Sequence, residues 1–307
     1  MAIENIQVLR ASIKKRKLWD QVFVVIAFIS LFFGFAILMG LMTQLFLQGA
    51  TRLNWSFLTS PPSPRAEEAG ILVASVGTAT VMLVTMVLAV PIGISSGIYL
   101  QEYAKKGWLS DVIEINVANL AGVPSIVYGL LALGLFKQQL QLGESIITAA
   151  LTLSLLILPV VIVTTREALK AIPQTLREGA YAIGTSRWQM VWDHVLPASA
   201  GGILTGIIVG LSRAIGEAAP LITIGALTFI TSLPDSPIKG EFPFISFSWL
   251  KSDFTVLPIQ MFDWVSRPQP AFQLNAGAAG IVLVLLTVIM NGAAIYLRIY
   301  FRNRIKW

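Results

Sequence analysis

The sequence contains no cysteine and a single histidine, His194. Disulfides and cysteine metal sites are therefore excluded, and a histidine-based metal site is not expected. Charged residues are also scarce, at 12% of the chain against 55% hydrophobic residues. A soluble domain carries about 25% charged residues, so this composition indicates a membrane protein. The net charge of +6 does not indicate a nucleic-acid-binding protein, because the basic residues gather at the ends of apolar runs instead of forming a stripe.

Long apolar runs are abundant. A helix needs about 20 predominantly apolar residues to cross the hydrocarbon core of a bilayer, and six stretches qualify. We predict membrane spans at about 21–47, 70–100, 117–136, 145–165, 201–232 and 274–299. The first stretch is too long for the roughly 7–15-residue core of a signal peptide, and no A-x-A-like site follows it, so we expect an uncleaved span. The sequence therefore predicts an all-α polytopic membrane protein, with a basic segment at 1–20 and one transmembrane domain at 21–307.

The distribution of lysine and arginine predicts how these spans are oriented. Placing the N-terminus inside leaves 15 basic residues on the inside and 6 on the outside. The inside segments are then 1–20, 101–116, 166–200 and 300–307 with Arg298, and the outside segments are 48–69, 137–144 and 233–273. We therefore expect both termini in the cytoplasm. The external loop 233–273 contains six prolines, which argues against a soluble helical domain there.

Small residues and prolines indicate how the spans pack. Glycine recurs at four-residue spacing in two spans, and this spacing lets helix backbones approach closely. These glycines are Gly93 and Gly97 in the second predicted span and Gly202, Gly206 and Gly210 in the fifth. Prolines inside or near spans are expected to kink the helices; these are Pro91, Pro124, Pro159 and Pro220.

The predicted inside loop between the fourth and fifth spans contains two short amphipathic segments. Pro173 suits the first turn of a helix, and we expect this helix to stop at Gly184 in the left-handed C′ conformation. Ser186 and Gln189 form a capping box that starts a second helix, which we expect to end at Pro197. The loop is therefore predicted to be a helix–turn–helix hairpin on the cytoplasmic face. Its periodicity alone fits an interfacial anchor equally well.

The spacing within this hairpin resembles the signature loop of ABC importer permeases, E-A-A, three residues, G, nine residues, I-x-L-P. Two positions depart from that pattern, because Gly179 replaces an alanine and His194 replaces the isoleucine. A helical glycine costs about 0.5–1 kcal/mol relative to alanine, so we expect a softer first helix. The resemblance implies that the loop docks onto a separate ATPase. The coupling residues that it implies are Glu178, Gly179, Ala180, Gly184, Arg187, Leu196 and Pro197.

Three further stretches extend the resemblance over most of the chain from about residue 70. AGVPSIVYGLLALGLF, LSRAIGEAAPL and FTVLPIQMFDWVSRP are similar to the phosphate-specific ABC transport permeases, and EAAPL favours their A subunit over the C-type partner. One departure is Val163, where A subunits often carry an arginine before two threonines. In this chain an arginine, Arg166, follows the threonine pair instead. The resemblance implies the fold of type I ABC importer permeases.

The resemblance also implies what the chain works with. No G-x-x-x-x-G-K-[ST] motif and no Gly-Lys dipeptide occur in the sequence, so the chain has no P-loop of its own. We therefore expect a transport subunit that is not an enzyme and holds no cofactor, with ATP and Mg²⁺ bound by two ATP-binding cassette subunits. The other implied partners are a homologous C-type permease, an extracytoplasmic phosphate-binding protein and the lipid of a bacterial inner membrane.

An arginine and a glutamate in the fifth predicted span form a second candidate site. Arg213 lies about 12 residues into that span, or about 18 Å at 1.5 Å per residue, which is near the bilayer middle. Glu217 follows four residues later on the same helical face. At an effective dielectric constant near 20 and ~4 Å, their attraction is about 4 kcal/mol. This roughly offsets the ~2.5–3.5 kcal/mol that a membrane-centred arginine costs on insertion.

Two interpretations of this pair are open. It is either a structural ion pair or part of a translocation path, in which the guanidinium binds two phosphate oxygens and Glu217 keeps that binding weak enough for release. The resemblance to phosphate permeases favours the second interpretation. Further candidates for the substrate path are Ser212, Ser125 and Tyr128.

Other classes of protein are weighed against this hypothesis. An ion-coupled secondary transporter also fits six spans and an intramembrane ion pair, but it needs no coupling loop. An ABC permease for sulfate, molybdate or phosphonate uses Arg213 equally well, so the choice of phosphate depends on the resemblance. A polytopic membrane enzyme is disfavoured, because it requires a cluster of Asp, His or Lys at one membrane face.

Overall fold

The computed structural model describes residues 2–105, 107–226, 229–236 and 246–304. Over these residues the chain is helical without a β-strand, and one isolated β-bridge joins Ser145 to Asp253. The chain divides into two compact units after Gln48. The first unit is formed by the long helix α1 (Ala2–Gly49) up to Gln48, and in it the basic segment and the first apolar stretch form one continuous helix.

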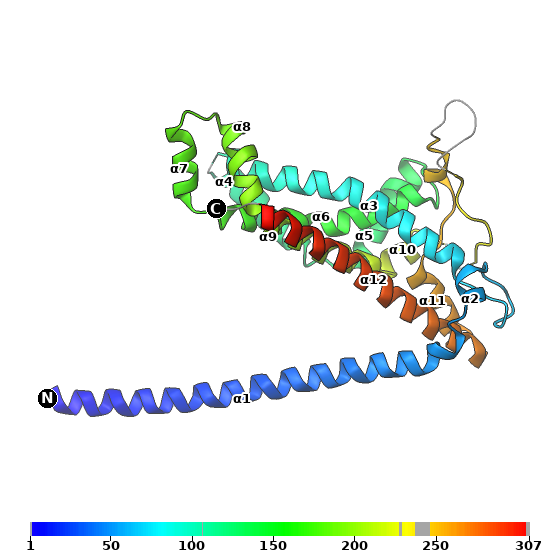
Figure 1. Ribbon diagram of the computed structural model, residues 1–307, viewed down its shortest axis with the longest axis horizontal. Helices are drawn as coiled ribbons and strands as arrows, with labels where there is room; N and C mark the ends of the chain where they lie inside the picture. The colour runs from blue at the N-terminus through cyan, green and yellow to red at the C-terminus, as the bar shows by residue number, and fades with distance from the viewer. Residues whose placement is uncertain (1, 106, 227–228, 237–245, 305–307) are drawn as a thin grey trace. The chain divides into compact units, whose positions relative to one another are not determined.

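The second unit, residues 49–307, is a helical bundle in which α6 packs along both α3 and α9, and α12 packs along α9 (Figure 1). Its helices are α2 (Trp55–Thr59), α3 (Leu72–Ile98), α4 (Trp108–Leu120), α5 (Ser125–Ala132), α6 (Ile146–Lys170), α7 (Gln174–Ala182), α8 (Arg187–Gln189), α9 (Leu196–Ile215), α10 (Ala219–Thr223), α11 (Leu257–Ser266) and α12 (Pro270–Arg304). In the described part of this unit, π-helical segments follow α3, α5 and α8 at Tyr99–Tyr103, Leu133–Gln139 and Met190–Val195, and 3₁₀ turns lie at Ala50–Arg52 and Ser248–Lys251.

The predicted close packing at the glycine repeats is confirmed. A Cβ atom added at Gly93 of α3 would lie 2.6 Å from Val161 Cγ1 of α6, and Gly97 repeats this close approach one turn later. On the second seam the α9 glycines lie against α6, with Gly202 at Ala168, Gly206 at Thr164, and Gly210 at Ile157 and Val161. At all of these positions except Gly210, where a Cβ would make ordinary contact, an added side chain would push the helices apart.

The third predicted span, 117–136, is wrong as a single helix. α4 ends at Leu120 and α5 begins at Ser125, and the two helices are bent by 103° relative to each other. Val123 precedes Pro124, and a residue before proline is disfavoured in the α conformation. The expected kink is therefore a break. Hydropathy does not reveal it, because the chain is apolar on both sides.

The fifth predicted span, 201–232, is also wrong as a continuous helix. α9 ends at Ile215 with Gly216 as its C-cap, and the short α10 follows after a break. Pro220 explains the break, because proline has no backbone N–H and its ring clashes with the carbonyl four residues earlier in a helix. An apolar run of sufficient length therefore does not guarantee an unbroken span.

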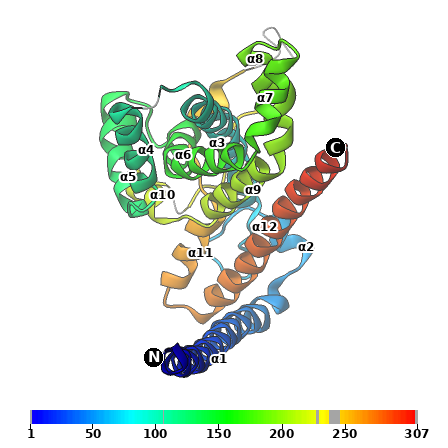
Figure 2. The same cartoon turned by 90° about the vertical axis from the view of Figure 1, so that its left-hand side faces the viewer.

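Five helices in the described residues are long and apolar enough to cross a membrane, and counting the bent pair α4–α5 as one span gives six. Within the second unit, α7, α8 and α4 lie at one end, whereas α2 and α11 lie at the other (Figure 1). Figure 2, seen from the hairpin end, shows α5 beside α10. The described parts of 101–116 and 166–200 therefore share one end of this unit, and those of 49–69 and 233–273 share the opposite end.

Candidate coupling hairpin and substrate path

The hairpin between α6 and α9 begins as the sequence predicts. α7 starts directly after Pro173, and the chain reverses at Gly184, whose φ of +85° is the left-handed C′ conformation. The predicted capping box is present. The Ser186 backbone N–H donates to Gln189 Oε1 at 2.9 Å, and the Gln189 N–H donates to Ser186 Oγ at 3.3 Å. Local sequence therefore determines both the turn and the start of the second helix.

The predicted end of that second helix at Pro197 is wrong. The helix runs from Arg187 to Ile215 as one 29-residue unit that includes the π-helical segment Met190–Val195. Pro197 lies just after the π-helical segment, and such a local change of helical register accommodates a proline inside a continuous helix. The hairpin therefore continues without a break into the helix that carries Arg213.

The predicted coupling residues divide into an exposed and a buried group. Ala180 is buried in an apolar cluster with Leu169, Met190, Val191 and Val195. This cluster fixes α7 against the second helix of the hairpin. The remaining predicted residues are exposed or partly exposed and are available to a partner; they are Glu178, Gly179, Gly184, Arg187, Leu196 and Pro197.

Arg177 is the important hairpin residue that sequence reasoning missed. Its side chain is 10% exposed and forms an ion pair with Glu102, which is 6% exposed, at 2.7 Å between Nη2 and Oε1. Its position in the sequence could have identified it as buried, because Arg177 lies three residues before Ala180 and therefore on the same face of α7. No local pattern identifies Glu102, which lies 75 residues away in the sequence.

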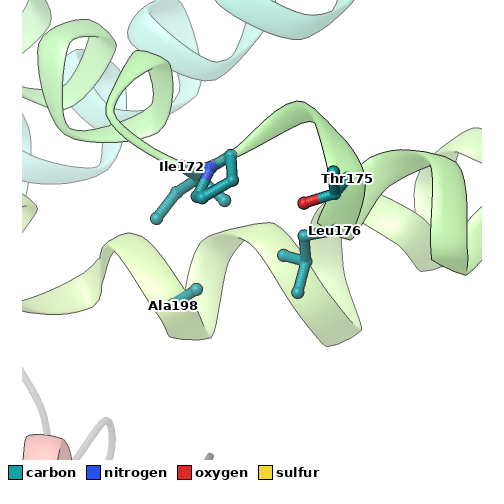
Figure 3. Close-up of a pocket in the computed structure, with 5 residues that line it drawn as sticks. Ile172, Thr175, Leu176 and Ala198 are labelled. Atoms are coloured by element: carbon teal, nitrogen blue, oxygen red, sulfur yellow. The ribbon is translucent and has the colours of Figure 1, made fainter.

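A cavity of about 400 Å³ lies at the base of the hairpin. In Figure 3, Ile172 and Leu176 from the α6–α7 connection and α7 point toward Ala198 at the start of α9. Pro173 and Thr175 complete the lining. The lining is mainly apolar, which is unsuited to an oxyanion, so we place the substrate elsewhere.

Arg213 and Glu217 lie at the break that ends α9. Arg213 Nε is 3.5 Å from Glu217 Oε1, and the side chains are 40% and 19% exposed. Because α9 runs antiparallel to α6 with Gly210 at Ile157, Arg213 is level with the middle of α6. A small cavity lined by Glu217 and Leu153 lies at the same level. The pair therefore lies about midway along the bundle.

Two other candidates for the substrate path, Tyr128 and Ser212, are hydrogen-bonded within the bundle. Tyr128 is buried, donates from its hydroxyl to the Leu120 carbonyl at 2.7 Å across the α4–α5 break, and lies within electrostatic reach of Arg213. Ser212 donates to the Ile208 carbonyl and lies 2.6 Å from Asn291 Oδ1 of α12. Its hydroxyl therefore joins α9 to α12. Asn291 was not identified from the sequence.

Ser125 lies in the broken third span, and Arg166 lies in α6 and contacts that span. Ser125 begins α5, directly after Pro124. Arg166 of α6 forms an ion pair with Glu114 of α4. Arg166 therefore has a partner in the bundle at the end that also contains the hairpin, and it does not lie beside Arg213.

Comparison with known proteins agrees with this geometry. The family described as binding-protein-dependent transport system inner membrane component matches residues 89–306. The phosphate transport system permease protein PstA of Yersinia pestis is 31% identical over 293 residues, which cover 94% of each chain. A probable ABC transporter permease protein of Bacillus subtilis, YqgI, is 33% identical over 193 residues, covering 63% of this chain and 66% of that protein.

Solved structures agree on the fold. An inward-facing structure of the methionine ABC transporter MetNI matches with a TM-score of 0.54 and 16% identity, and the match covers 73% of this chain and 94% of that chain. At this identity the likeness establishes architecture only, which is the ABC importer permease fold expected from the sequence. With its family match and its full-length relatives, this chain belongs to the inner membrane components of binding-protein-dependent transport systems.

Proposed function

We propose that this chain is one of two permease subunits in an ATP-driven importer of inorganic phosphate. A homologous permease forms the other half of the translocation path, and two ATP-binding cassette subunits bind and move the hairpin. A phosphate-binding protein delivers substrate on the opposite side of the membrane. Both chain termini and the hairpin end of the bundle then face the cytoplasm. The similarity to phosphate permeases over nearly the whole chain supports the choice of cargo.

The observation that carries this proposal is the position, exposure and pairing of the Arg213 side chain. Its guanidinium lies midway along the bundle, remains 40% exposed, and pairs only through Nε at 3.5 Å within the described residues. A guanidinium offers two parallel donors to a phosphate and stays charged at any physiological pH. Glu217 orients this group and competes for it, so that the anion binds and leaves.

The structure of the hairpin supports the other part of the proposal, which is that movement of the ATP-binding cassette subunits is transmitted to the substrate path. Its turn is fixed by Gly184, its second helix is capped by Ser186, and that helix continues directly to Arg213. A push on the exposed face of the hairpin therefore reaches the substrate path without crossing a flexible joint. An interfacial anchor needs no such continuity.

The proposal is tested by purifying the chain with its partners from phosphate-starved cells and reconstituting the complex in proteoliposomes. We expect an ATP-binding cassette subunit and a second permease to co-purify, and phosphate uptake to require ATP and to survive an uncoupler. Uptake that needs an ion gradient and no ATP indicates a secondary transporter instead. Uptake of sulfate, molybdate or phosphonate in preference to phosphate changes the cargo but keeps the permease.

A further inference from the structure

The base of the hairpin contains the most deeply buried ion pair between described residues. Arg177 of α7 and Glu102 of the π-helical segment Tyr99–Tyr103 are joined by two nitrogen–oxygen contacts, Nη2–Oε1 at 2.7 Å and Nε–Oε2 at 3.4 Å. This bidentate arrangement fixes the orientation of both side chains as well as their separation. A contact of this kind resists displacement in either direction, whereas an apolar contact slides.

Arg177 uses its remaining donors on the same region. Its Nη1 donates to the Ile172 carbonyl at 2.7 Å, and its Nη2 donates to the Leu169 carbonyl at 2.9 Å. Leu169 belongs to the last turn of α6, and Glu102 lies just beyond α3. One side chain of the hairpin therefore joins the ends of the two helices that form the centre of the bundle.

The second helix of the hairpin contacts the same π-helical segment. The Arg187 guanidinium lies over the Tyr103 ring, 5.2 Å from its centroid. Both helices of the hairpin therefore contact residues that directly follow α3. Further along these helices, α3 and α6 pack closely at Gly93 and Gly97, where the Val161 and Thr165 side chains of α6 lie directly on the α3 backbone.

We propose that the Glu102–Arg177 ion pair is the contact through which the hairpin moves α3 and α6 during transport. The two residues are positioning residues, since neither lies at the substrate path. This inference rests on the proposed function, because it takes the hairpin to be worked by an ATPase. It adds a route that does not follow the chain, from the first arm of the hairpin into helices that precede it in sequence.

The test measures phosphate imported per ATP hydrolysed in the reconstituted complex with its binding protein. The double variant Glu102→Leu with Arg177→Met replaces both residues with apolar side chains of similar size and removes both charges together. Proteins often keep their fold and stability after such a replacement of a buried ion pair. We expect hydrolysis to continue while phosphate imported per ATP falls at least about tenfold. Arg177→Lys, which keeps the charge and loses the fork, is expected to lie about two- to fivefold below the wild type.

Glu167→Gln is the matched control. Glu167 pairs with Lys170 at 3.8 Å near the same end of α6, but both side chains are more than half exposed. This variant is expected to keep the wild-type ratio.

The inference is overturned if the apolar double variant keeps the wild-type ratio, or if Arg177→Lys performs no better than that double variant. Should the double variant fail to assemble, Glu102→Gln decides, since it keeps the size and one acceptor; a wild-type ratio in that variant also overturns the inference. Failure of the proposed function is seen separately, in the wild-type complex, as import without ATP or absence of an ATPase partner.

Discussion

Two arginine–glutamate pairs in this protein differ in nearly every property that governs an ion pair. Arg177 and Glu102 come from distant segments, are 10% and 6% exposed, and meet through two contacts, the shorter being 2.7 Å. Arg213 and Glu217 are four residues apart, are 40% and 19% exposed, and meet at 3.5 Å through one nitrogen. The first arginine also donates to two backbone carbonyls.

This difference separates structural from functional arginines. Arg177 makes four hydrogen bonds inside the protein with its five N–H groups, so it has little left for a substrate, and removing it leaves a buried carboxylate without its partner. An arginine with open donors contributes little to folding but is able to bind an anion that passes it. In the two proposals made above, the same residue type therefore transmits force at one end of α6 and contacts substrate near its middle.

The largest expected effect is on stability, at the buried pair. Arg177→Ala leaves the Glu102 carboxylate buried without its counter-charge, and breaking such a pair costs about 3–5 kcal/mol. We expect a clear drop in the thermal unfolding midpoint of the purified complex. Arg65→Ala is the control, because Arg65 and Glu68 are 79% and 59% exposed and such pairs contribute at most about 1 kcal/mol. Equal changes in the two variants would contradict the assignment of Arg177 as structural.

The next effect is on transport, at the open pair. Arg213→Gln removes a charged donor pair from the path, and a hydrogen bond to a charged group contributes about 1.5–3 kcal/mol, so phosphate uptake is expected to fall about 10- to 100-fold. Assembly and the unfolding midpoint stay near the wild type. The control is Arg267→Gln, which breaks another i,i+4 pair, with Asp263, on α11. Normal uptake by Arg213→Gln removes this residue from the path.

A smaller effect is expected at the turn of the hairpin. Gly184→Val places a β-branched residue at φ +85°, where an L-residue is strained by about 1–2 kcal/mol. We expect less ATPase to co-purify and less phosphate to be imported per ATP. Gly184→Asn is the matched variant, since asparagine tolerates the left-handed conformation, and it should recover much of the loss. Full coupling in Gly184→Val shows that the turn geometry is dispensable.

The smallest effect is a gain in stability. Gly179 lies within α7, and no heavy atom of the described residues stands within 4 Å of a Cβ added there. Gly179→Ala is therefore expected to raise stability by about 0.5–1 kcal/mol, visible as a higher unfolding midpoint. Gly206→Ala is the opposing case, because its Cβ would overlap Thr164 at the α6–α9 seam and lower the midpoint. A loss of stability in Gly179→Ala would show that the first arm of the hairpin needs its glycine.

Two errors in the sequence-based prediction fall where a helix stops inside an apolar run, and a third is the helix that continues through Pro197. The span lengths followed from hydropathy, but AGVP and GEAAP break α4 from α5 and α9 from α10. Both breaks contain a proline that the sequence already marked for a kink. Whether a proline bends or ends a helix depends on what packs around it, since Pro91 and Pro159 lie inside continuous helices.

The sequence alone determined the features that depend on residues close together along the chain. Its apolar runs, the capping box at Ser186, the left-handed turn at Gly184 and the spacing of the signature loop all act over such short distances. Only the tertiary structure decided which polar groups from distant segments meet. Arg177 pairs with Glu102 across 75 positions, and Ser212 contacts Asn291 across 79, because packed helices bring distant segments together and no local pattern encodes that choice.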